Sequence, residues 1–292
     1  MATPKQVLIL GGSFGGLTSA NLIRKSLSQE ECQITVVDKY QYFMMGLVNL
    51  WILSGSRRLE DSQIALNKLE AKGIKFLNDE ITGIDPSENS VTTKTNPKKL
   101  KYDYLVIALG AEVAPKLIDG LEDNDDQSCF NVYDAKQVPL LREKLLSMKS
   151  GRVVVCIADI PYKCPPAPYE ASLLMNDILV KNGTRDSIDL NMYVPTPIAL
   201  PVAGPTMSQD VVNLLNNNHI NFHPLHKLKK VSDKKTVEFE NGNKTSYDVL
   251  VMIPPHQVPK VIKDSNLLGD GDQGWINVDR FTLRTKYKNV FA

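Results

Sequence analysis

A glycine-rich turn between an apolar run and a helical pattern constrains the fold of this chain more than any other feature. The run QVLIL at residues 6–10 is typical of a buried strand, the turn covers residues 11–16, and a helix is expected over residues 17–27. A second apolar run, QITVV, follows at residues 33–37. A strand, a helix and a second strand within about 30 residues predict two parallel strands joined by a right-handed crossover.

The turn, LILGGSFGGL, matches most of a dinucleotide-binding fingerprint. In that fingerprint three glycines serve the tight turn, the close approach of a pyrophosphate and the packing of the helix. Here the three positions are Gly11, Ser13 and Gly16, so serine replaces the middle glycine. Gly12 and Gly15 keep the loop small. The helix N-terminus offers free N–H groups and a positive dipole end to a phosphate.

An acidic residue and a second motif extend this predicted site. Asp38 ends the second strand, where a carboxylate is expected to accept hydrogen bonds from the adenosine ribose. The segment YDYLVIALGAE at residues 102–112 resembles the second signature of two-dinucleotide-binding flavoproteins, which implies FAD in the first domain. The alternatives are a turn that serves only packing and an ordinary buried strand. The predicted cofactor-binding residues are Gly11, Gly12, Ser13, Phe14, Gly15, Gly16, Asp38, Lys39, Ile81, Ala108 and Gly110.

The strand–helix–strand pattern begins again in the middle of the chain. A strand is expected at residues 152–158, a helix at 169–181 and a strand at 187–194. The sequence therefore predicts an α/β fold with two Rossmann-like domains, the first lacking part of its C-terminal region. We expect an FAD-binding domain from residues 1–114 and 258–292, and a second, degenerate NAD-like domain from residues 115–257. Further helices are expected over residues 58–72, 134–148 and 208–217, and further strands over 75–84, 90–94, 101–108 and 248–253.

Charge and cysteine spacing exclude several classes of function. The formal net charge of +1 gives no bulk electrostatic support for a nucleic-acid partner. No run approaches the ~20 apolar residues of a membrane span, and the N-terminus does not resemble a secretion signal, so we expect a cytoplasmic protein. The four cysteines are far apart and form no metal-ligand cluster, so no metal site is predicted.

The loop that follows the strand expected at residues 152–158 is unusual. It reads PYKCPPAPYE from Pro161 to Glu170 and contains four prolines, a cysteine and no glycine. Proline lacks the N–H group that a phosphate needs, and the next strand ends in MYVPTP without an acid or arginine for a nucleotide ribose. NAD(P) binding is therefore not expected here. Cys164 lies before a helix and beside Lys163, and both features favour a thiolate and a redox or nucleophilic role. The alternative, a small apolar filler, suits Cys156 and Cys32 better.

KCPPAPYE resembles the cysteine segment of flavocytochrome c sulfide dehydrogenases and sulfide:quinone oxidoreductases, with tyrosine five and glutamate six residues after the cysteine. Four other stretches share the resemblance, which covers essentially the whole chain: GGSFGG, LPVAGPTMSQDVV, VMIPPHQVP and GWINVDRFTLRTKYKNVFA. It implies that Cys164 pairs with a second, later cysteine across the flavin. Sulfide attacks that disulfide, a persulfide forms, and electrons pass to FAD and then to a quinone or cytochrome.

The resemblance also assigns two further candidates. Cys129 lies near the place where some quinone-linked members carry a third cysteine. Glu170 would be the nearest proton-handling group, and its alternative role is that of a first-turn carboxylate favoured by the helix dipole. The predicted catalytic residues are therefore Cys164, Glu170 and Cys129.

Two departures from the family pattern matter. The flavocytochromes attach FAD through a cysteine after the second strand, whereas this chain reads FMMGLVNLW at residues 43–51, so non-covalent FAD is expected. The chain also stops at NVFA, before the glycine–aspartate run and partner cysteine of the relatives. It is then either a fragment of a longer protein or a flavoprotein without a complete site.

The sequence thus predicts an FAD-dependent oxidoreductase of the sulfide dehydrogenase type, with a small sulfur compound as substrate. Two alternatives stay open: a type II NADH dehydrogenase-like flavin enzyme, and a non-catalytic flavin-binding module or fragment. Peripheral membrane contact through a region beyond Ala292 and a homodimer are further expectations of the resemblance.

Overall fold

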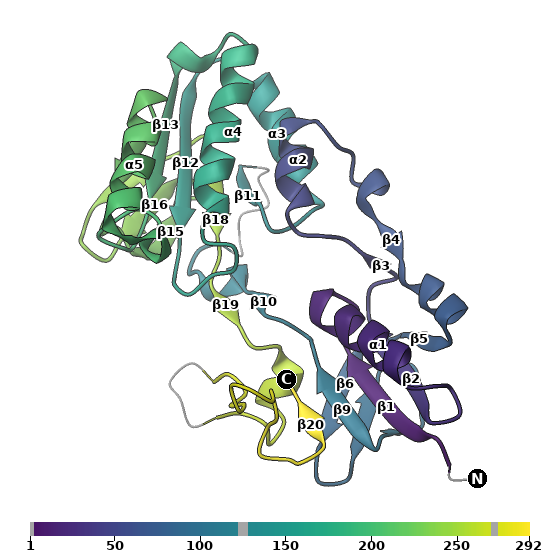
Figure 1. Ribbon diagram of the computed structural model, residues 1–292. Helices are drawn as coiled ribbons and strands as arrows, with labels where there is room; N and C mark the ends of the chain where they lie inside the picture. Colours follow the sequence, from purple (N-terminus) through teal and green to yellow (C-terminus); the bar gives the residue numbers. More distant parts are fainter. Residues whose placement is uncertain (1–2, 122–127, 270–273) are drawn as a thin grey trace. The chain divides into compact units, whose positions relative to one another are not determined.

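A computed structural model describes residues 3–121, 128–269 and 274–292. The described chain divides into two compact units (Figure 1). Unit 1 comprises Met1–Met45, Gln63–Glu112 and Gln257–Ala292, and unit 2 comprises Gly46–Ser62 and Val113–His256. Each unit contains its own parallel sheet, as expected of two Rossmann-like domains.

Unit 1 is built around a five-stranded parallel sheet in the order β20-β9-β1-β2-β5. Its strands are β1 (Lys5–Leu10), β2 (Cys32–Asp38), β5 (Ile74–Asn78), β9 (Tyr104–Ile107) and β20 (Val290–Phe291). Strands β1 and β2 pair from Lys5↔Cys32 to Leu10↔Val37, and helix α1 (Phe14–Ser26) makes the crossover between them. The central strands read as continuous apolar runs because both faces of the sheet are buried.

Smaller elements complete unit 1. Strands β6 (Ile81–Asp85), β7 (Ser90–Thr93) and β8 (Leu100–Lys101) form an antiparallel sheet. Strands β3 (Tyr42–Phe43) and β4 (Ile64–Ala65) form a short ribbon, and 3-10 helix η2 (Leu66–Lys72) leads into β5. Helix α6 (Lys260–Lys263) follows the return of the chain, and its buried Ile262 joins the core beside β9 and β20.

Unit 2 has a second five-stranded parallel sheet, in the order β11-β18-β12-β13-β14. Its strands are β11 (Cys129–Asn131), β12 (Gly151–Ile157), β13 (Ile188–Tyr193), β14 (Asn221–His223) and β18 (Val249–Ile253). Helices α3 (Gln137–Ser147), α4 (Ala167–Lys181) and α5 (Gly204–Asn217) lie beside the sheet (Figure 1). A three-stranded antiparallel sheet of β15 (Leu228–Ser232), β16 (Thr236–Phe239) and β17 (Lys244–Ser246) packs its apolar residues against the other side of the core.

The structure corrects the predictions at three places. The single strand expected over residues 75–84 is two strands, β5 and β6, in different sheets. Residues 46–62, expected in the first domain, belong to unit 2. Helix α2 (Val48–Ser54) buries Val48, Ile52 and Leu53, and the guanidinium of Arg142 on α3 donates to the Leu53 carbonyl at 3.1 Å. The helix predicted over residues 58–72 is wrong, because this segment forms η1 (Glu60–Ser62), β4 and η2.

Candidate functional site

The turn after β1 is shaped by two glycines that no other residue can replace. Gly11 has φ +104°, and a Cβ there would lie 2.3 Å from the carbonyl oxygen of Ala108. A Cβ on Gly16 would lie 1.8 Å from the carbonyl oxygen of Gly11. The Ala108 N–H donates to the Leu10 carbonyl at 2.7 Å, which fixes the end of β9 beside the turn. The two outer fingerprint glycines therefore serve close packing of strand, turn and helix.

The first turn of α1 faces outward. Ser13 stands at the N-cap without a side-chain capping bond, and Ser13, Phe14 and Gly15 are exposed. The Phe14 ring packs edge-on against Phe43 at a centroid distance of 5.2 Å. Exposed N–H groups at the start of a 13-residue helix form the kind of surface that binds a pyrophosphate.

Asp38 is held at the edge of this turn. Its Oδ2 accepts from the Gly12 N–H at 2.5 Å, and its Oδ1 accepts from the Tyr40 N–H at 2.8 Å. The structure thus brings Asp38 against the glycine turn, as the fingerprint requires. Lys39 is exposed, with its ammonium 5.4 Å from the centroid of the Tyr40 ring.

Asp79 is a buried acid that the sequence reasoning missed. Its side chain is only 4% exposed and accepts from the Thr95 N–H and hydroxyl and from the Asn96 and Glu80 N–H groups. Burial acts to raise the pKa of Asp79, but hydrogen bonds from Thr95, Thr93 and the backbone outweigh it and lower the pKa to about 2. The Asp79 N–H also donates to the Asp38 carbonyl, which joins this acid to the predicted ribose site.

The remaining predicted cofactor residues flank the turn or begin the small sheet. Ala108 and Gly110 follow β9, and Gly110 has φ +67°. Ile81 is the first residue of β6 and packs against the unit 1 core. The outward helix N-terminus, the narrow glycine turn and the adjacent carboxylate fit a dinucleotide such as FAD.

In unit 2, three neighbouring parallel strands bring chemically active side chains to one edge of the sheet. Tyr133 follows β11, His256 follows β18, and Lys163 and Cys164 lie in the loop after β12. The carboxyl ends of parallel strands are where ligands bind in open α/β sheets. The Tyr133 hydroxyl donates to the Lys163 carbonyl at 2.5 Å, and the Lys163 ammonium lies 5.1 Å from the Tyr133 ring centroid.

Cys164 is half-buried among these groups. It has φ +53°, its thiol is free, and its carbonyl accepts from the Ala167 N–H at the start of α4. Burial is the largest cause that raises the pKa of Tyr133 well above its usual range. Electrostatic interaction with Tyr162 and Cys164 adds to this shift. Burial lowers the pKa of Lys163, and a negative charge on Cys164 would oppose that shift. A thiolate at Cys164 would thus be in electrostatic contact with the Lys163 ammonium.

The other two catalytic candidates lie differently. Glu170 is exposed in the first turn of α4, a position that the helix dipole alone explains. Cys129 begins β11 and packs against the core cluster that contains Cys156 and the residues of the antiparallel sheet. Burial raises the pKa of Cys156 far above its usual range, with a smaller contribution from Cys129. Catalytic roles for Glu170 and Cys129 stay predictions.

In unit 2 an aromatic stack stands at the strand end that corresponds to Asp38 in unit 1. Tyr193 ends β13, the strand equivalent to the one that ends in Asp38 in unit 1. Its ring stacks on His223 at 4.3 Å and on Phe239 at 4.8 Å. Nearby, the Tyr169 hydroxyl accepts from the Leu200 N–H at 2.8 Å and so fixes the loop after β13. These contacts are structural and leave no carboxylate for a nucleotide at this position.

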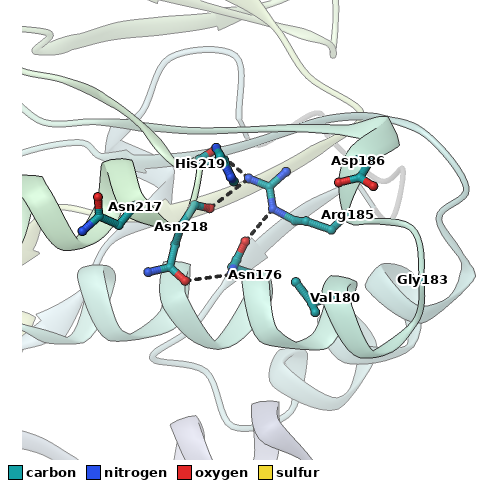
Figure 2. Close-up of a pocket in the computed structure, with 8 residues that line it drawn as sticks. All are labelled: Asn176, Val180, Gly183, Arg185, Asp186, Asn217, Asn218 and His219. Carbon is teal, nitrogen blue, oxygen red and sulfur yellow. Dashed lines mark hydrogen bonds between the residues drawn. The ribbon is translucent and has the colours of Figure 1, made fainter.

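A surface pocket of about 360 Å³ lies beside the start of β13, and Figure 2 shows residues that line it. Arg185 lines it and directs its guanidinium to the Asn176 side chain and to the Ile188 and His219 carbonyls, at 2.5–2.6 Å. Because these bonds tie α4, α5 and the start of β13 together, the guanidinium is engaged in structural contacts. The pocket is at the amino ends of the strands, so we do not regard it as the functional site.

The described residues hold no site of two other kinds. No group of three or more His, Cys, Asp or Glu residues in the described ranges could hold a metal ion. Within the same ranges, every helix is too short or too polar to cross a bilayer.

Comparison with known proteins agrees with this geometry. The sequence pattern of the pyridine nucleotide-disulphide oxidoreductase family matches residues 5–156, more than half of the chain. The chain therefore belongs to that family, whose members are FAD-binding flavoproteins. Residues 138–254 match the central region of the flavoprotein chain of flavocytochrome c sulfide dehydrogenase. Within the family, the chain is thus similar to sulfide:quinone oxidoreductases and to the flavoprotein chain of flavocytochrome c sulfide dehydrogenase.

Individual relatives are similar over nearly the whole chain. A mitochondrial sulfide:quinone oxidoreductase of Dictyostelium discoideum is 30% identical over 98% of this chain and 64% of its own length. The crystal structure of the Aquifex aeolicus sulfide:quinone oxidoreductase superposes with a TM-score of 0.85 at 26% identity, covering 98% of this chain and 67% of the other. A type II NADH:quinone oxidoreductase of Staphylococcus haemolyticus is 32% identical, but over only 41% of this chain and 29% of its own length. The chain spans about two thirds of the length of the first two.

Proposed function

We propose that this chain is part or all of an FAD-dependent oxidoreductase that takes electrons from sulfide, or a related sulfur compound, through Cys164. The observation that carries the proposal is the loop after β12. There a half-buried free thiol stands beside Lys163 at the carboxyl edge of a parallel sheet, where a related dehydrogenase would bind a nicotinamide nucleotide. The relatives named for sulfide and quinone support the same substrate class.

FAD, when bound, supplies the electron acceptor for this chemistry. The residues proposed to hold it are those of the glycine turn, the first turn of α1 and Asp38. Met44 and Met45 occupy the segment after β2, and the four cysteines lie elsewhere in the sequence, so we propose that the flavin is held without a covalent bond. A quinone is the proposed final acceptor, with a cytochrome as the alternative. Peripheral membrane contact and a homodimer stay predictions.

The second candidate is a flavin enzyme that oxidises NADH, because a type II NADH:quinone oxidoreductase matches part of the chain. Two features of unit 2 argue against it. The loop from Pro161 to Pro168 has four prolines and no glycine, so the backbone N–H groups that bind a phosphate are depleted. Tyr193, at the end of β13, is stacked between His223 and Phe239 where an acid would bind the ribose.

An anaerobic titration of the FAD-loaded chain distinguishes these functions. We expect sulfide to bleach the flavin absorbance, NADH to leave it unchanged, and Cys164→Ser to abolish the sulfide response. Cys129→Ser is the matched control. Comparing its sulfide response with that of Cys164→Ser shows which of the two cysteines the reaction needs. Rapid bleaching by NADH without any response to sulfide would replace the proposal by the NADH dehydrogenase function. Flavin that binds but responds to neither donor would indicate a non-catalytic module.

A further inference from the structure

His256 has a buried ring nitrogen that nothing in the described part of the chain satisfies. Its Nδ1 lies 3.0 Å from the Pro254 carbonyl oxygen. A carbonyl only accepts hydrogen bonds, so Nδ1 carries the ring hydrogen and Nε2 carries the lone pair. Among the described residues, Nε2 is buried and has no hydrogen-bond partner. A buried acceptor without a donor is unfavourable, and in native proteins it often indicates a bound group.

Tyr133 links His256 to the loop that carries Cys164. The rings of Tyr133 and His256 pack edge to face at a centroid distance of 5.5 Å. Tyr133 also holds the Lys163 carbonyl, and Lys163 is the residue before Cys164. Strand β18, which leads to His256, pairs with both β11 and β12, so the three loops are neighbours at one edge of the sheet.

Burial, with a neighbouring positive charge, favours the neutral imidazole of His256. Burial is the largest cause that lowers the pKa of His256, and the Lys163 ammonium adds to it, whereas the hydrogen bond to Pro254 acts in the opposite direction. The Tyr133 ring, after the end of β11, packs against the imidazole, and Lys163, from the loop after β12, is the charged side chain that contributes to the shift. No carboxylate of the described chain contributes to this shift. A neutral imidazole with a free lone pair is a proton acceptor.

We propose that, once Cys164 is oxidised to a disulfide with a second thiol, Nε2 of His256 accepts the proton that hydrogen sulfide releases when it attacks the Cys164 sulfur. This inference rests on the proposed sulfide chemistry and names a further residue for it. A bond forms between the sulfide sulfur and the Cys164 sulfur, and the old disulfide bond breaks. Its electron pair leaves with the departing thiolate, so the disulfide is reduced and the sulfide sulfur is oxidised. One proton of hydrogen sulfide passes to Nε2, and Cys164 is left as a persulfide.

This assignment differs from the one that the family resemblance suggested. Glu170 lies exposed on the first turn of α4, where water surrounds it. His256 is instead half-buried against Tyr133, and the positive charge of Lys163 acts on its ring. The imidazole lone pair has no competing donor among the described residues, whereas the exposed carboxylate is hydrated.

A single-turnover assay tests the proposal without flavin. Cys164 is converted to a mixed disulfide with a nitrobenzoate thiol, in a Cys129→Ser background where the remaining cysteines, Cys32 and Cys156, are buried. Sulfide is added at constant total concentration across a pH series. Release of the coloured aromatic thiolate gives the rate, and the mass of the Cys164 peptide identifies the persulfide. The aromatic thiolate is the better leaving group, so attack on the Cys164 sulfur is favoured.

The expected result is a change in the pH profile. Hydrosulfide needs no base, so His256→Phe should react like the parent at alkaline pH. Below neutral pH, hydrogen sulfide dominates and the variant should be slower by about tenfold or more, the lower range for loss of a general base. His256→Gln keeps a hydrogen-bond acceptor but cannot take up the proton, so it should resemble His256→Phe.

The matched control is His226→Phe. His226 lies in the same unit, but its Nε2 is within 2.9 Å of the Asn243 side-chain nitrogen, so it has no free lone pair. The parental pH profile in His256→Phe, equal slowing in His226→Phe, or full activity in His256→Gln would each overturn the proposal, as would a Cys164 that cannot be labelled. Circular dichroism checks that each variant is folded. If the profile changes as expected but sulfide never bleaches bound FAD, the proton acceptor stands and the proposed electron route fails.

Discussion

The loops after β1 and after β12 occupy the same place in two similar parallel-sheet units, yet their chemistry is opposite. After β1, Gly11 and Gly16 let the backbone pack closely, and the first turn of α1 presents free N–H groups. After β12, prolines remove N–H groups and Cys164 is held with φ +53°. One topology therefore presents either backbone donors for a phosphate or a side chain for sulfur chemistry, and only the loop residues decide which.

The ends of the next strands differ in the same direction. Asp38, at the end of β2, accepts from the Gly12 N–H and so lies within reach of a ribose. Tyr193, at the end of β13, is 8% exposed and stacks on His223. Unit 2 thus departs from the nucleotide-binding pattern in two separated segments, which is more than a single altered loop.

The largest effect is expected from Gly16→Ala. The added Cβ would lie 1.8 Å from the Gly11 carbonyl oxygen, and neither backbone can move without breaking the turn. We expect the free energy of unfolding of unit 1 to fall by at least about 3 kcal/mol, which is large for one substitution. Gly15→Ala is the matched control, since its Cβ meets only the Ala108 Cβ at 3.4 Å, and it should change stability by less than about 1 kcal/mol. Denaturant unfolding of the flavin-free protein measures both, and equal effects would disprove the packing argument.

Asp38→Ala should weaken FAD binding without unfolding the protein. The variant loses the carboxylate that accepts a hydrogen bond from the Gly12 N–H and is expected to accept others from the ribose hydroxyls. Hydrogen bonds to charged groups contribute about 1.5–3 kcal/mol, so the affinity for FAD should fall roughly tenfold to hundredfold. Fluorescence quenching of added FAD gives the dissociation constant. The equivalent change in unit 2, Tyr193→Phe, should leave it unchanged, and a similar loss there would remove the distinction between the two strand ends.

Much of this arrangement follows from local sequence. The glycine turn, Asp38 and the proline-rich cysteine loop are each short patterns whose strand and helix context lies within a few residues, so their positions were predictable. Family membership and the FAD cofactor were also predicted from these patterns, and comparison with known proteins confirmed both. The prolines after β12 also indicate, from residue type alone, that this loop is a poor phosphate site, because each proline removes an N–H donor.

What the sequence did not reveal depends on contacts between distant segments. Helix α2 belongs to unit 2 because its apolar face packs against α3 and α4, which are remote in the chain. Tyr133 and His256 come together because β18 inserts between β11 and β12, an order that no local pattern encodes. The one available signal was VMIPPHQVP, where a histidine follows an apolar run at the carboxyl end of a buried strand. Asp79 was missed because its donors lie across a hairpin.

An intermediate effect is expected on the pH dependence of stability, from the buried acid Asp79 of unit 1. The pKa of Asp79 is lowered from its usual 3.8 to about 2, so its ionised form is favoured in the folded state. Its contribution is present above about pH 4 and is lost as the pH falls towards 2. Asp79→Asn should therefore flatten the acid side of the stability curve. Unfolding midpoints across the acid range, compared with those of the parent protein, measure this change.

The smallest effect is expected from Tyr169→Phe, which tests how α4 holds the loop after β13. The Tyr169 side chain is 4% exposed and its hydroxyl accepts from the Leu200 N–H, so the variant leaves a donor without its partner. The cost should be about 1–3 kcal/mol in the free energy of unfolding. Tyr162→Phe removes a half-buried hydroxyl that donates to the Pro165 carbonyl at 3.1 Å, and water can replace it at under about 1 kcal/mol. If the two variants cost the same, the bond from Leu200 to Tyr169 does not hold the loop after β13 more firmly than the bond within the cysteine loop is held.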